Sequence, residues 1–391
     1  MTAGRGREAY RGLPEEARIC ARCGACRTAC PVYAEIGWES SSPRGRIELA
    51  RRALRGEGGL DPASVRRALE CTLCGGCRDA CPAEIDTRRF LLDLRGEIRA
   101  AGRCPGPYLA LAEAVDGRGN ISPFDNASRA DWLDEVEDRD AAVDPASPVG
   151  YFVGCVASFY PMVTDIPASF AGLAARMGRP VSVLGPREHC CGFPLIAAGM
   201  EARAAQVIRH NLEAVRESGI ETLVTGCPSC LHTWTHAYPE AAGGPLGFEV
   251  LHLARYLLRC LDEGVLDPAG AEPLDLVVTY HDPCDLGRNL GEYDAPREVL
   301  RRLPGVRLVE MAHTRELALC CGGGGNLQAV DPDLTRALAA RRVREALDTG
   351  ASVLATACQQ CVQVLAEAAR RSRARLRVLD IVQLVGEAFE D

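Results

Sequence analysis

A repeated set of five cysteines constrains this chain of 391 residues more than any other feature. In the first copy, Cys155 is followed by the adjacent pair Cys190 and Cys191 and then by Cys227 and Cys230. The second copy lies 129 to 131 residues further along the chain and consists of Cys284, Cys320, Cys321, Cys358 and Cys361. Because the two sets match along their whole length with only single-residue slips, the C-terminal part is predicted to be an internal repeat.

The number of these cysteines indicates iron–sulfur clusters. Five thiolates exceed the four ligands of a tetrahedral zinc ion, whereas iron–sulfur clusters are held by several cysteine thiolates. Gly192 and Gly322 directly follow the two adjacent pairs, and we expect positive φ there, so that the backbone comes close to a cluster without a side-chain clash. The glycine run 322–325 is expected to give the loop freedom and not to cradle a phosphate. The alternative, that the ten cysteines are buried structural thiols, does not account for their repetition in register.

Two further runs of cysteines near the N-terminus have the ferredoxin spacing Cys-x2-Cys-x2-Cys-x3-Cys-Pro. The first run contains Cys20, Cys23, Cys26 and Cys30, and the second contains Cys71, Cys74, Cys77 and Cys81. In two-cluster ferredoxins, three cysteines of a run hold one [4Fe–4S] cluster and the fourth binds the other cluster. We therefore expect Cys81 to complete the first group of three and Cys30 to complete the second. Zinc is the competing interpretation of a Cys-x2-Cys pair, but two complete runs with the trailing proline argue against it.

Helical segments are expected between and around these two runs. One helix is predicted over residues 43–55, and a second begins at Asp61 and leads to Cys71. The N-terminal module is therefore predicted to be mainly helical. Arg44 and Arg46 lie in the first of these helices. They either hydrogen-bond near a cluster and raise its potential or are solvated, and the sequence leaves both interpretations open.

Short β-branched runs alternate with longer helical ones after residue 148. We expect strands over residues 149–154, 181–184, 221–225, 276–280, 306–310 and 352–356. We expect helices over residues 168–177, 200–217, 246–261, 296–303 and 334–347, and a last long helix that begins at Cys358 and Cys361. This alternation predicts an α/β fold with parallel sheets covered by helices. Each group of cysteines follows the carboxyl end of a predicted strand, which is where open α/β sheets bind ligands.

These patterns divide the chain into four segments. Residues 1–102 are predicted to be a helical ferredoxin domain, residues 103–148 a linker, and residues 149–270 and 271–391 the two repeated α/β domains. The acidic stretch from Asp131 to Asp140 is interpreted as part of a solvated linker with a short helix, with a docking surface for a basic partner as the alternative. Cys104 and Cys260 fall outside both cysteine patterns and are expected not to be ligands; Cys260 is expected in the core.

Composition argues against several other classes of protein. The chain has 45 basic and 53 acidic residues and a net charge of −8, which argues against nucleic acid as a partner. Twenty cysteines in a long chain without a secretory signal do not suggest a disulfide framework. The most apolar predicted helix, 246–261, is interrupted by charged residues and cannot span a membrane. We therefore expect a cytoplasmic protein that contacts a membrane only through a partner subunit, with a membrane or quinone-linked protein as a candidate partner.

The cysteine motifs of the C-terminal 240 or so residues resemble the paired cysteine-rich CCG domains of heterodisulfide reductase. The whole chain is similar to the D-type subunit of heterodisulfide reductase and to the iron–sulfur subunit of glycolate or lactate oxidases. The resemblance implies that each set of five cysteines holds a noncubane [4Fe–4S] cluster and that a disulfide substrate lies between the two sets. The segment Pro43-Arg44-Gly45-Arg46-Ile47 looks like the glycolate oxidase branch, whereas the presence of all ten repeat cysteines looks like the reductase.

Two ferredoxin-type clusters and two further clusters in one polypeptide would form a path for single electrons. We expect an iron–sulfur electron-transfer subunit of an oxidoreductase complex, which passes electrons between a flavoprotein partner and a disulfide, thiol or quinone acceptor. Cluster potentials span roughly −700 to +450 mV, so the direction of flow stays open. The alternatives are the iron–sulfur subunit of a glycolate or lactate oxidase, a non-redox zinc scaffold, or a chain that is itself the disulfide reductase. For this last alternative His189, His281 and His313 are candidate proton donors, because histidine titrates near neutral pH.

Overall fold

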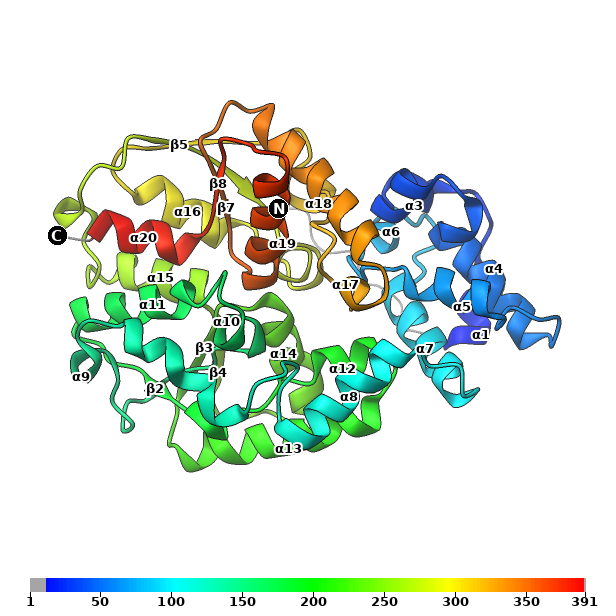
Figure 1. The fold of residues 1–391 in the computed structure, drawn as a ribbon, viewed down its shortest axis with the longest axis horizontal. Helices are drawn as coiled ribbons and strands as arrows, with labels where there is room; N and C mark the ends of the chain where they lie inside the picture. The colour runs from blue at the N-terminus through cyan, green and yellow to red at the C-terminus, as the bar shows by residue number, and fades with distance from the viewer. Residues whose placement is uncertain (1–11, 390–391) are drawn as a thin grey trace.

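The computed structural model describes residues 12–389, which form a helical N-terminal module and two α/β units (Figure 1). The module lies at one end of the molecule, and the two α/β units lie one above the other beside it in this view. We expected an N-terminus without a secretory signal, and the part of it before residue 12 lies outside the described residues. The α/β fold class and the mainly helical N-terminal module are both confirmed.

The N-terminal module consists of short helices joined by the cysteine loops. Local capping explains where they begin: the Ser42 hydroxyl accepts a hydrogen bond from the Gly45 amide, and the Asp61 carboxylate accepts from two amides of the next turn. Both helices predicted here are confirmed. The elements are α1 (Leu13–Ile19), α2 (Ala25–Thr28), α3 (Pro31–Ile36), η1 (Glu39–Ser41), α4 (Pro43–Leu54), α5 (Pro62–Leu69), α6 (Gly76–Asp79) and α7 (Thr87–Ala100).

The segment 103–148, which we interpreted as a solvated linker with a short helix, is folded against the rest of the chain. It contains α8 (Gly106–Arg118), η2 (Asn126–Glu135) and α9 (Arg139–Ala142). Tyr108 and Trp132 are fully or almost fully buried in it. The solvated-linker interpretation is wrong here because apolar side chains between the acidic residues pack into the cores of the neighbouring units. The domain boundaries themselves stay a prediction.

The two α/β units have the same sheet topology, as the internal repeat predicts. The first sheet has the order β2-β1-β3-β4 and the second has the order β6-β5-β7-β8, with every pair parallel. The strands of the first sheet are β1 (Val149–Tyr151), β2 (Ser182–Val183), β3 (Thr222–Thr225) and β4 (Glu249–His252). Those of the second sheet are β5 (Leu276–His281), β6 (Val306–Val309), β7 (Val353–Thr356) and β8 (Arg377–Asp380).

The helices of the two repeats connect and cover these strands. In the first repeat they are α10 (Cys155–Phe159), α11 (Asp165–Arg176), η3 (Gly185–Arg187), α12 (Phe193–Ala197), α13 (Glu201–Glu217), α14 (Pro228–Ala242), α15 (Leu253–Asp262) and η4 (Pro268–Gly270). In the second they are η5 (Asp285–Asn289), α16 (Asp294–Arg302), η6 (Arg315–Leu317), α17 (Leu327–Val330), α18 (Pro332–Leu347), α19 (Gln359–Arg371) and α20 (Ile381–Phe389).

One prediction about these elements is wrong, and two elements were missed. Residues 246–261 are not one helix, because β4 pairs with β3 and the chain turns into α15 only at His252. The Nδ1 atom of this histidine accepts a hydrogen bond from the Ala254 amide and so caps α15. The long helix predicted to begin at Cys358 is confirmed as α19, but β8 and the shorter α20, which follow it, were not predicted. Pairing with a distant strand overrode the local apolar pattern at β4.

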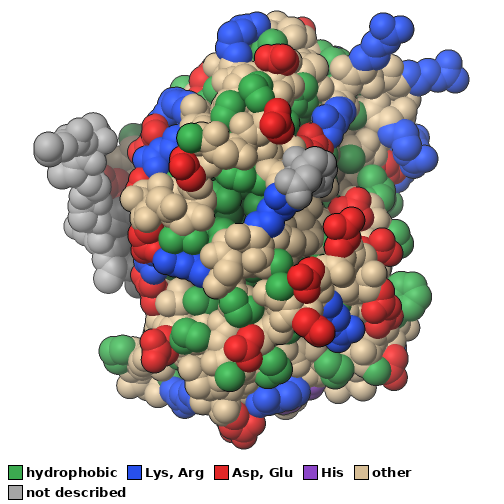
Figure 2. All heavy atoms as spheres, turned by 90° about the vertical axis from the view of Figure 1, so that its left-hand side faces the viewer, with side chains coloured by type: hydrophobic (Ala, Val, Ile, Leu, Met, Phe, Trp, Pro, Cys, Tyr) green, Lys and Arg blue, Asp and Glu red, His purple; other side chains and the backbone are tan. Residues whose placement is uncertain are grey.

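The two repeats share one hydrophobic core. Helices α11 and α15 of the first repeat pack against α20 and α16 of the second, and Phe170, Leu257, Val299 and Val385 are fully buried between the units. Cys260 is also fully buried in this core, whereas Cys104 is half-buried in a loop. Acidic and basic side chains are interspersed on the face of the molecule that Figure 2 shows.

Candidate metal centres

The first group of ferredoxin cysteines includes one cysteine from the other run, as the spacing of the motif predicts. Cys20, Cys23 and Cys26 line a small cavity, and the fourth cysteine of that cavity is Cys81, from the other run. The short helix α2 lies against α6, which brings the two runs side by side. Burial raises the pKa of the Cys26 thiol to about 11. This cavity therefore offers four sulfur atoms from two distant loops.

A second cavity holds the complementary group. It is lined by Cys71, Cys74 and Cys77 together with Cys30, and Arg46 contributes to its wall. Burial raises the pKa of the Cys30 thiol to about 12, so a bare Cys30 thiol would be neutral at pH 7. Binding a metal there requires loss of this proton.

Two buried guanidinium groups near this second cavity fit a negatively charged group inside it. Arg46 and Arg95 are each 1% exposed. Arg46 donates to the carbonyl oxygens of Arg67 (2.7 Å) and Glu70 (2.6 Å), and Arg95 donates to four backbone carbonyls, one of them that of Cys71. A buried charge is costly unless an opposite charge compensates it. An iron–sulfur cluster with its thiolates would supply that negative charge, so the residues fit the cofactor.

The two arginines whose roles the sequence left open have different surroundings in the structure. The Arg46 side chain is buried beside the second cavity. Arg44 is more exposed and pairs with Glu39, with Nε and Oε1 2.7 Å apart, and its Nη1 donates to the Arg22 carbonyl. The position of Arg46 therefore supports a role in hydrogen bonding near a cluster, whereas Arg44 forms an ion pair at the rim of the first cavity.

The repeat cysteines occupy equivalent places after equivalent strands. Cys155 begins α10 after β1, and Cys284 precedes η5 after β5. Cys227 and Cys358 each occupy the N-cap position of the helix that follows the third strand of their sheet, α14 and α19. Gly192 and Gly322 have φ values of 94° and 88°, so the positive φ predicted after the adjacent cysteines is confirmed. Strand ends and helix N-termini thus position both sets.

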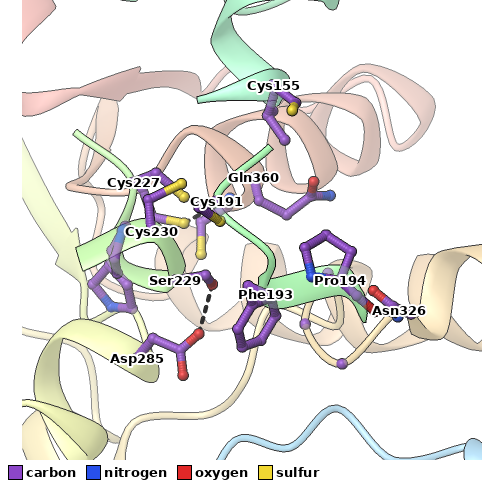
Figure 3. Close-up of a pocket in the computed structure, with 18 of the residues that line it drawn as sticks. Cys155, Cys191, Phe193, Pro194, Cys227, Ser229, Cys230, Asp285, Asn326 and Gln360 are labelled. Atoms are coloured by element: carbon purple, nitrogen blue, oxygen red, sulfur yellow. Dashed lines mark hydrogen bonds between the residues drawn. The ribbon is translucent and has the colours of Figure 1, made fainter. Parts of the chain in front are cut away.

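The two sets of repeat cysteines face one common cavity of about 140 Å³. Figure 3 labels four cysteines of the first set in it, Cys155, Cys191, Cys227 and Cys230. Nine of the ten repeat cysteines line it, all except Cys320. Two hydrogen bonds join the repeats beside it: Ser229 donates to Asp285 (2.6 Å), and the Gln359 side chain donates to the Val153 carbonyl (3.1 Å). We call this space the inter-repeat cavity. Its thiols come from both units, so a molecule inside it would meet both sets.

Cys320 points instead toward the N-terminal module. Its thiol is the hydrogen-bonding neighbour that most raises the pKa of Cys74. Arg288 bridges the same junction: its Nε donates to the Cys74 carbonyl (2.8 Å) and its Nη1 to the Ala318 carbonyl (2.6 Å). Burial lowers the pKa of Arg288, but the sulfur atoms of Cys74, Cys284 and Cys320 together raise it above its ordinary value. The second ferredoxin cavity and the second repeat are therefore in direct contact.

A different buried arginine lies beside the first repeat. Arg129, from η2, donates to Glu188 at 2.7 Å and to the Cys155 sulfur at 3.4 Å, and both charged side chains are 1% exposed. Glu188 also accepts from the amides of Val153 and Gly154. Arg129 could not be found from the sequence because it lies in the segment predicted to be a linker, and Arg288 could not because no local motif contains it.

The three candidate histidines lie in different surroundings. His281 is buried, its Nδ1 accepts from Arg342 Nε (3.0 Å), and its ring lies in one group with the thiols of Cys321 and Cys361. Burial and the charge of Arg342 hold its pKa well below the ordinary value. Burial and the stacked ring of His210 lower the pKa of His189 to about 4. The side chain of His313 is half exposed and bonds to Glu345. A proton-donor role stays a prediction for all three.

The fold and these cysteine groups define a class, that of iron–sulfur electron-transfer proteins with a dicluster domain and paired cysteine-rich domains. The family model for a 4Fe-4S dicluster domain matches residues 16–85, and the model for the cysteine-rich CCG domain matches residues 149–234 and 278–366. Within that class, the chain belongs to the family of the D-type subunits of heterodisulfide reductase and is an iron–sulfur subunit of an oxidoreductase.

The similarity to curated proteins covers almost the whole chain. The D-type subunit of the dihydromethanophenazine:CoB–CoM heterodisulfide reductase from Methanosarcina barkeri is 31% identical, over 96% of this chain and 94% of that protein. The probable iron-sulfur-binding oxidoreductase FadF from Bacillus subtilis is 28% identical, over 81% of this chain and 46% of that one. The EtfAB:quinone oxidoreductase from Syntrophomonas wolfei is 24% identical, over 95% and 58% respectively. Residues 12–389 contain no helix with the length and apolar character that a membrane crossing needs.

Proposed function

We propose that this chain carries electrons from a flavoprotein partner through four iron–sulfur clusters to an acceptor in the inter-repeat cavity. The observation that carries the proposal is the convergence of nine repeat cysteines from both units on that one cavity. When bound, the clusters supply one-electron redox chemistry. Two such centres on opposite sides of one acceptor suit a two-electron reduction.

The proposed ligand sets follow the cavities. Cys20, Cys23, Cys26 and Cys81 hold one cubane [4Fe–4S] cluster, and Cys30, Cys71, Cys74 and Cys77 hold the other. Each repeat holds one further cluster of noncubane type. The ligands of these two clusters are Cys155, Cys190, Cys191, Cys227 and Cys230 in the first repeat and Cys284, Cys320, Cys321, Cys358 and Cys361 in the second.

The proposed order of electron transfer follows the contacts between the sites. The proximity of Cys74 to Cys320 and the bridging hydrogen bonds of Arg288 support transfer from the second ferredoxin site to the second repeat. Buried guanidinium groups beside these thiols stabilise added negative charge and so favour the reduced state. The first repeat then faces the same acceptor across the inter-repeat cavity.

A disulfide is the first candidate for the acceptor. Its reduction consumes two electrons and two protons, breaks the S–S bond and releases two thiols. Sulfur-rich walls on both sides of the cavity support this candidate, because each set can take one sulfur of the cleaved bond. The name of the Methanosarcina relative points to the same chemistry, and that of the Syntrophomonas relative points to a quinone as the second candidate.

Cofactor content is the first test. We expect anaerobically purified protein to hold about sixteen irons and a similar amount of acid-labile sulfide, as four [4Fe–4S] clusters require. Cys74→Ser should lose the iron of one cluster, whereas the matched variant Cys104→Ser should lose none. Zinc in excess with little sulfide would contradict the redox proposal.

Reoxidation of the reduced protein is the second test. Protein reduced with dithionite and freed of excess reductant should be reoxidised by a disulfide alone, followed by its visible absorption. Reoxidation that requires an added flavoprotein or quinone would refute disulfide reduction in this chain while leaving electron transfer intact.

A further inference from the structure

His281, at the end of β5, is a buried histidine with one ring nitrogen that no protein group satisfies. The residue is 1% exposed. Its Nδ1 accepts a hydrogen bond from Nε of Arg342 (3.0 Å), whereas Nε2 has no hydrogen-bond partner among the described residues. A buried polar atom without a partner is costly, because it has lost its hydrogen bonds to water. Nε2 of His281 is therefore suited to a polar or charged group that binds beside it.

The hydrogen bond from Arg342 determines which ring nitrogen of His281 carries the proton. A guanidinium N–H can only donate, so Nδ1 must accept and the proton of the neutral ring lies on Nε2. Arg342 is fully buried and is itself held in place, because its Nη1 donates to the Glu345 carboxylate (2.7 Å) and to the His313 carbonyl (2.9 Å). A second proton on the ring would face the N–H of this guanidinium. His281 is therefore a neutral hydrogen-bond donor at Nε2.

Two cysteines of the second set lie beside this histidine. A ring nitrogen of His281 and the Sγ atoms of Cys321 and Cys361 all lie within 4.8 Å of one another. If Nε2 were to bind iron, it would have to offer its lone pair, and the ring proton would move to Nδ1, where it would face the N–H of Arg342. The arrangement therefore fits a donor to sulfur and not a further ligand of iron.

The first repeat has a phenylalanine at the equivalent place. Phe152 stands three residues before Cys155, as His281 stands three residues before Cys284. Phe152 is fully buried and packs edge-to-face on Trp234, with the ring centroids 5.5 Å apart. A phenyl ring has no N–H to donate. The two sets of thiols therefore have different surroundings at this place, although the strands and helices that position them repeat.

We propose that Nε2–H of His281 donates a hydrogen bond to a sulfur atom of the cluster in the second repeat and raises the midpoint potential of that cluster. This inference rests on the proposed function, because it needs a cluster at Cys321 and Cys361. A donor to sulfur stabilises the negative charge that reduction adds, and hydrogen bonds to sulfur are among the factors that set cluster potentials. Cys320 of the same set interacts with Cys74, so the bond acts on the cluster that receives electrons first in the proposed order. His281 keeps its proton in this role, which therefore differs from that of a proton donor.

Two substitutions of His281 separate the hydrogen bond from the shape of the side chain. His281→Phe removes the donor and should lower the reduction equilibrium constant of one cluster about tenfold, or about 59 mV for one electron, as expected for one hydrogen bond to a charged group. His281→Gln keeps an amide oxygen that can accept from Arg342 and an amide N–H that can donate to sulfur, so it should restore most of this loss. The matched control His236→Gln, at an exposed histidine of α14, should shift no potential. A redox titration of the holoprotein followed by electron paramagnetic resonance measures these constants.

Hyperfine spectroscopy of wild-type holoprotein labelled with ¹⁵N-histidine needs no substitution at His281. We expect one weakly coupled histidine nitrogen at the resonance signal whose potential shifts in His281→Phe, and a coupled proton that exchanges in deuterium oxide. A strongly coupled nitrogen, which marks a direct bond to iron, overturns the inference, and so does the absence of any coupled histidine nitrogen. This measurement also decides the matter if His281→Phe does not retain its iron.

The potentials and the iron content distinguish failure of this inference from failure of the proposed function. An unshifted potential in His281→Phe with normal iron content overturns the inference alone, as does a loss in His281→Gln that equals the loss in His281→Phe. If iron and sulfide analysis of the wild-type protein shows no cluster in the second repeat, the proposed function falls and the inference with it.

Discussion

Substitution of Gly325 by alanine should weaken the contact between the second repeat and the ferredoxin module. Gly325 has a φ of 62°, and a Cβ atom there would lie 2.5 Å from the Cys71 carbonyl oxygen and 2.7 Å from the carbonyl carbon of Thr72. These are backbone atoms, so a side-chain rotation cannot relieve the overlap. The Gly325 carbonyl also accepts hydrogen bonds from Arg95 and Tyr108. The glycine run therefore allows a close approach of two chain segments, in addition to the loop freedom that we expected.

A matched control variant, Gly350→Ala, allows the expected loss of stability in Gly325→Ala to be estimated. Gly350 has a φ of 72° and no atom within 4 Å of its Cβ position. Gly350→Ala should therefore cost only the backbone strain of positive φ, about 1 kcal/mol. Gly325→Ala carries the same strain and in addition the overlap with backbone atoms, which costs about 1–3 kcal/mol more. We thus expect Gly325→Ala to lower the free energy of unfolding by about 2–4 kcal/mol.

Urea denaturation followed by circular dichroism measures both free energies under the same conditions. A second readout is the rate of reoxidation by the acceptor, which should fall in Gly325→Ala and stay unchanged in Gly350→Ala, since the altered contact lies next to Cys71 and Thr72. Iron content should be normal in both variants. Equal losses of stability in the two variants, with equal rates, would refute the reasoning that Gly325 is required for close approach.

Three other perturbations have expected outcomes. Glu188→Gln removes the charge that pairs with buried Arg129 and should lower the free energy of unfolding by about 3 kcal/mol; a loss below about 1 kcal/mol in denaturant titrations contradicts this. Burial lowers the pKa of His252 to about 4, so the stability that its neutral form contributes is complete above pH 6.5 and decreases by about 3 kcal/mol as the pH falls to 4. His252→Asn keeps a capping side chain and should flatten this pH dependence; an unchanged slope contradicts it. Arg46→Met removes a buried positive charge beside Cys30 and Cys71. It should lower the midpoint potential of one ferredoxin-type cluster by about 60 mV, a tenfold change for one electron. A redox titration followed by electron paramagnetic resonance measures this potential, and an unshifted value contradicts the prediction.

The sequence by itself determined the features that depend on short stretches of chain. Ligand spacing in a loop, positive φ after an adjacent cysteine pair and the change from strand to helix are local, because each is set by neighbouring residues. For this reason the amino-acid sequence was enough to predict the repeat, the fold class and the positive φ of Gly192 and Gly322. The exchange of Cys30 and Cys81 between the ferredoxin runs also followed, because the spacing of that motif implies it.

Only the tertiary structure decided what lies next to these groups. Arg288 and Cys74 are 214 residues apart, and Gln359 and Val153 are 206 residues apart. The start of α15 at His252 depends in the same way on the pairing of β4 with β3. No local pattern encodes such contacts, because they arise when separate units bury apolar surface against one another and their remaining polar groups find partners across the junction. The common cavity of the two repeats, the turn of Cys320 toward the ferredoxin module and the burial of the segment 103–148 are all consequences of that packing.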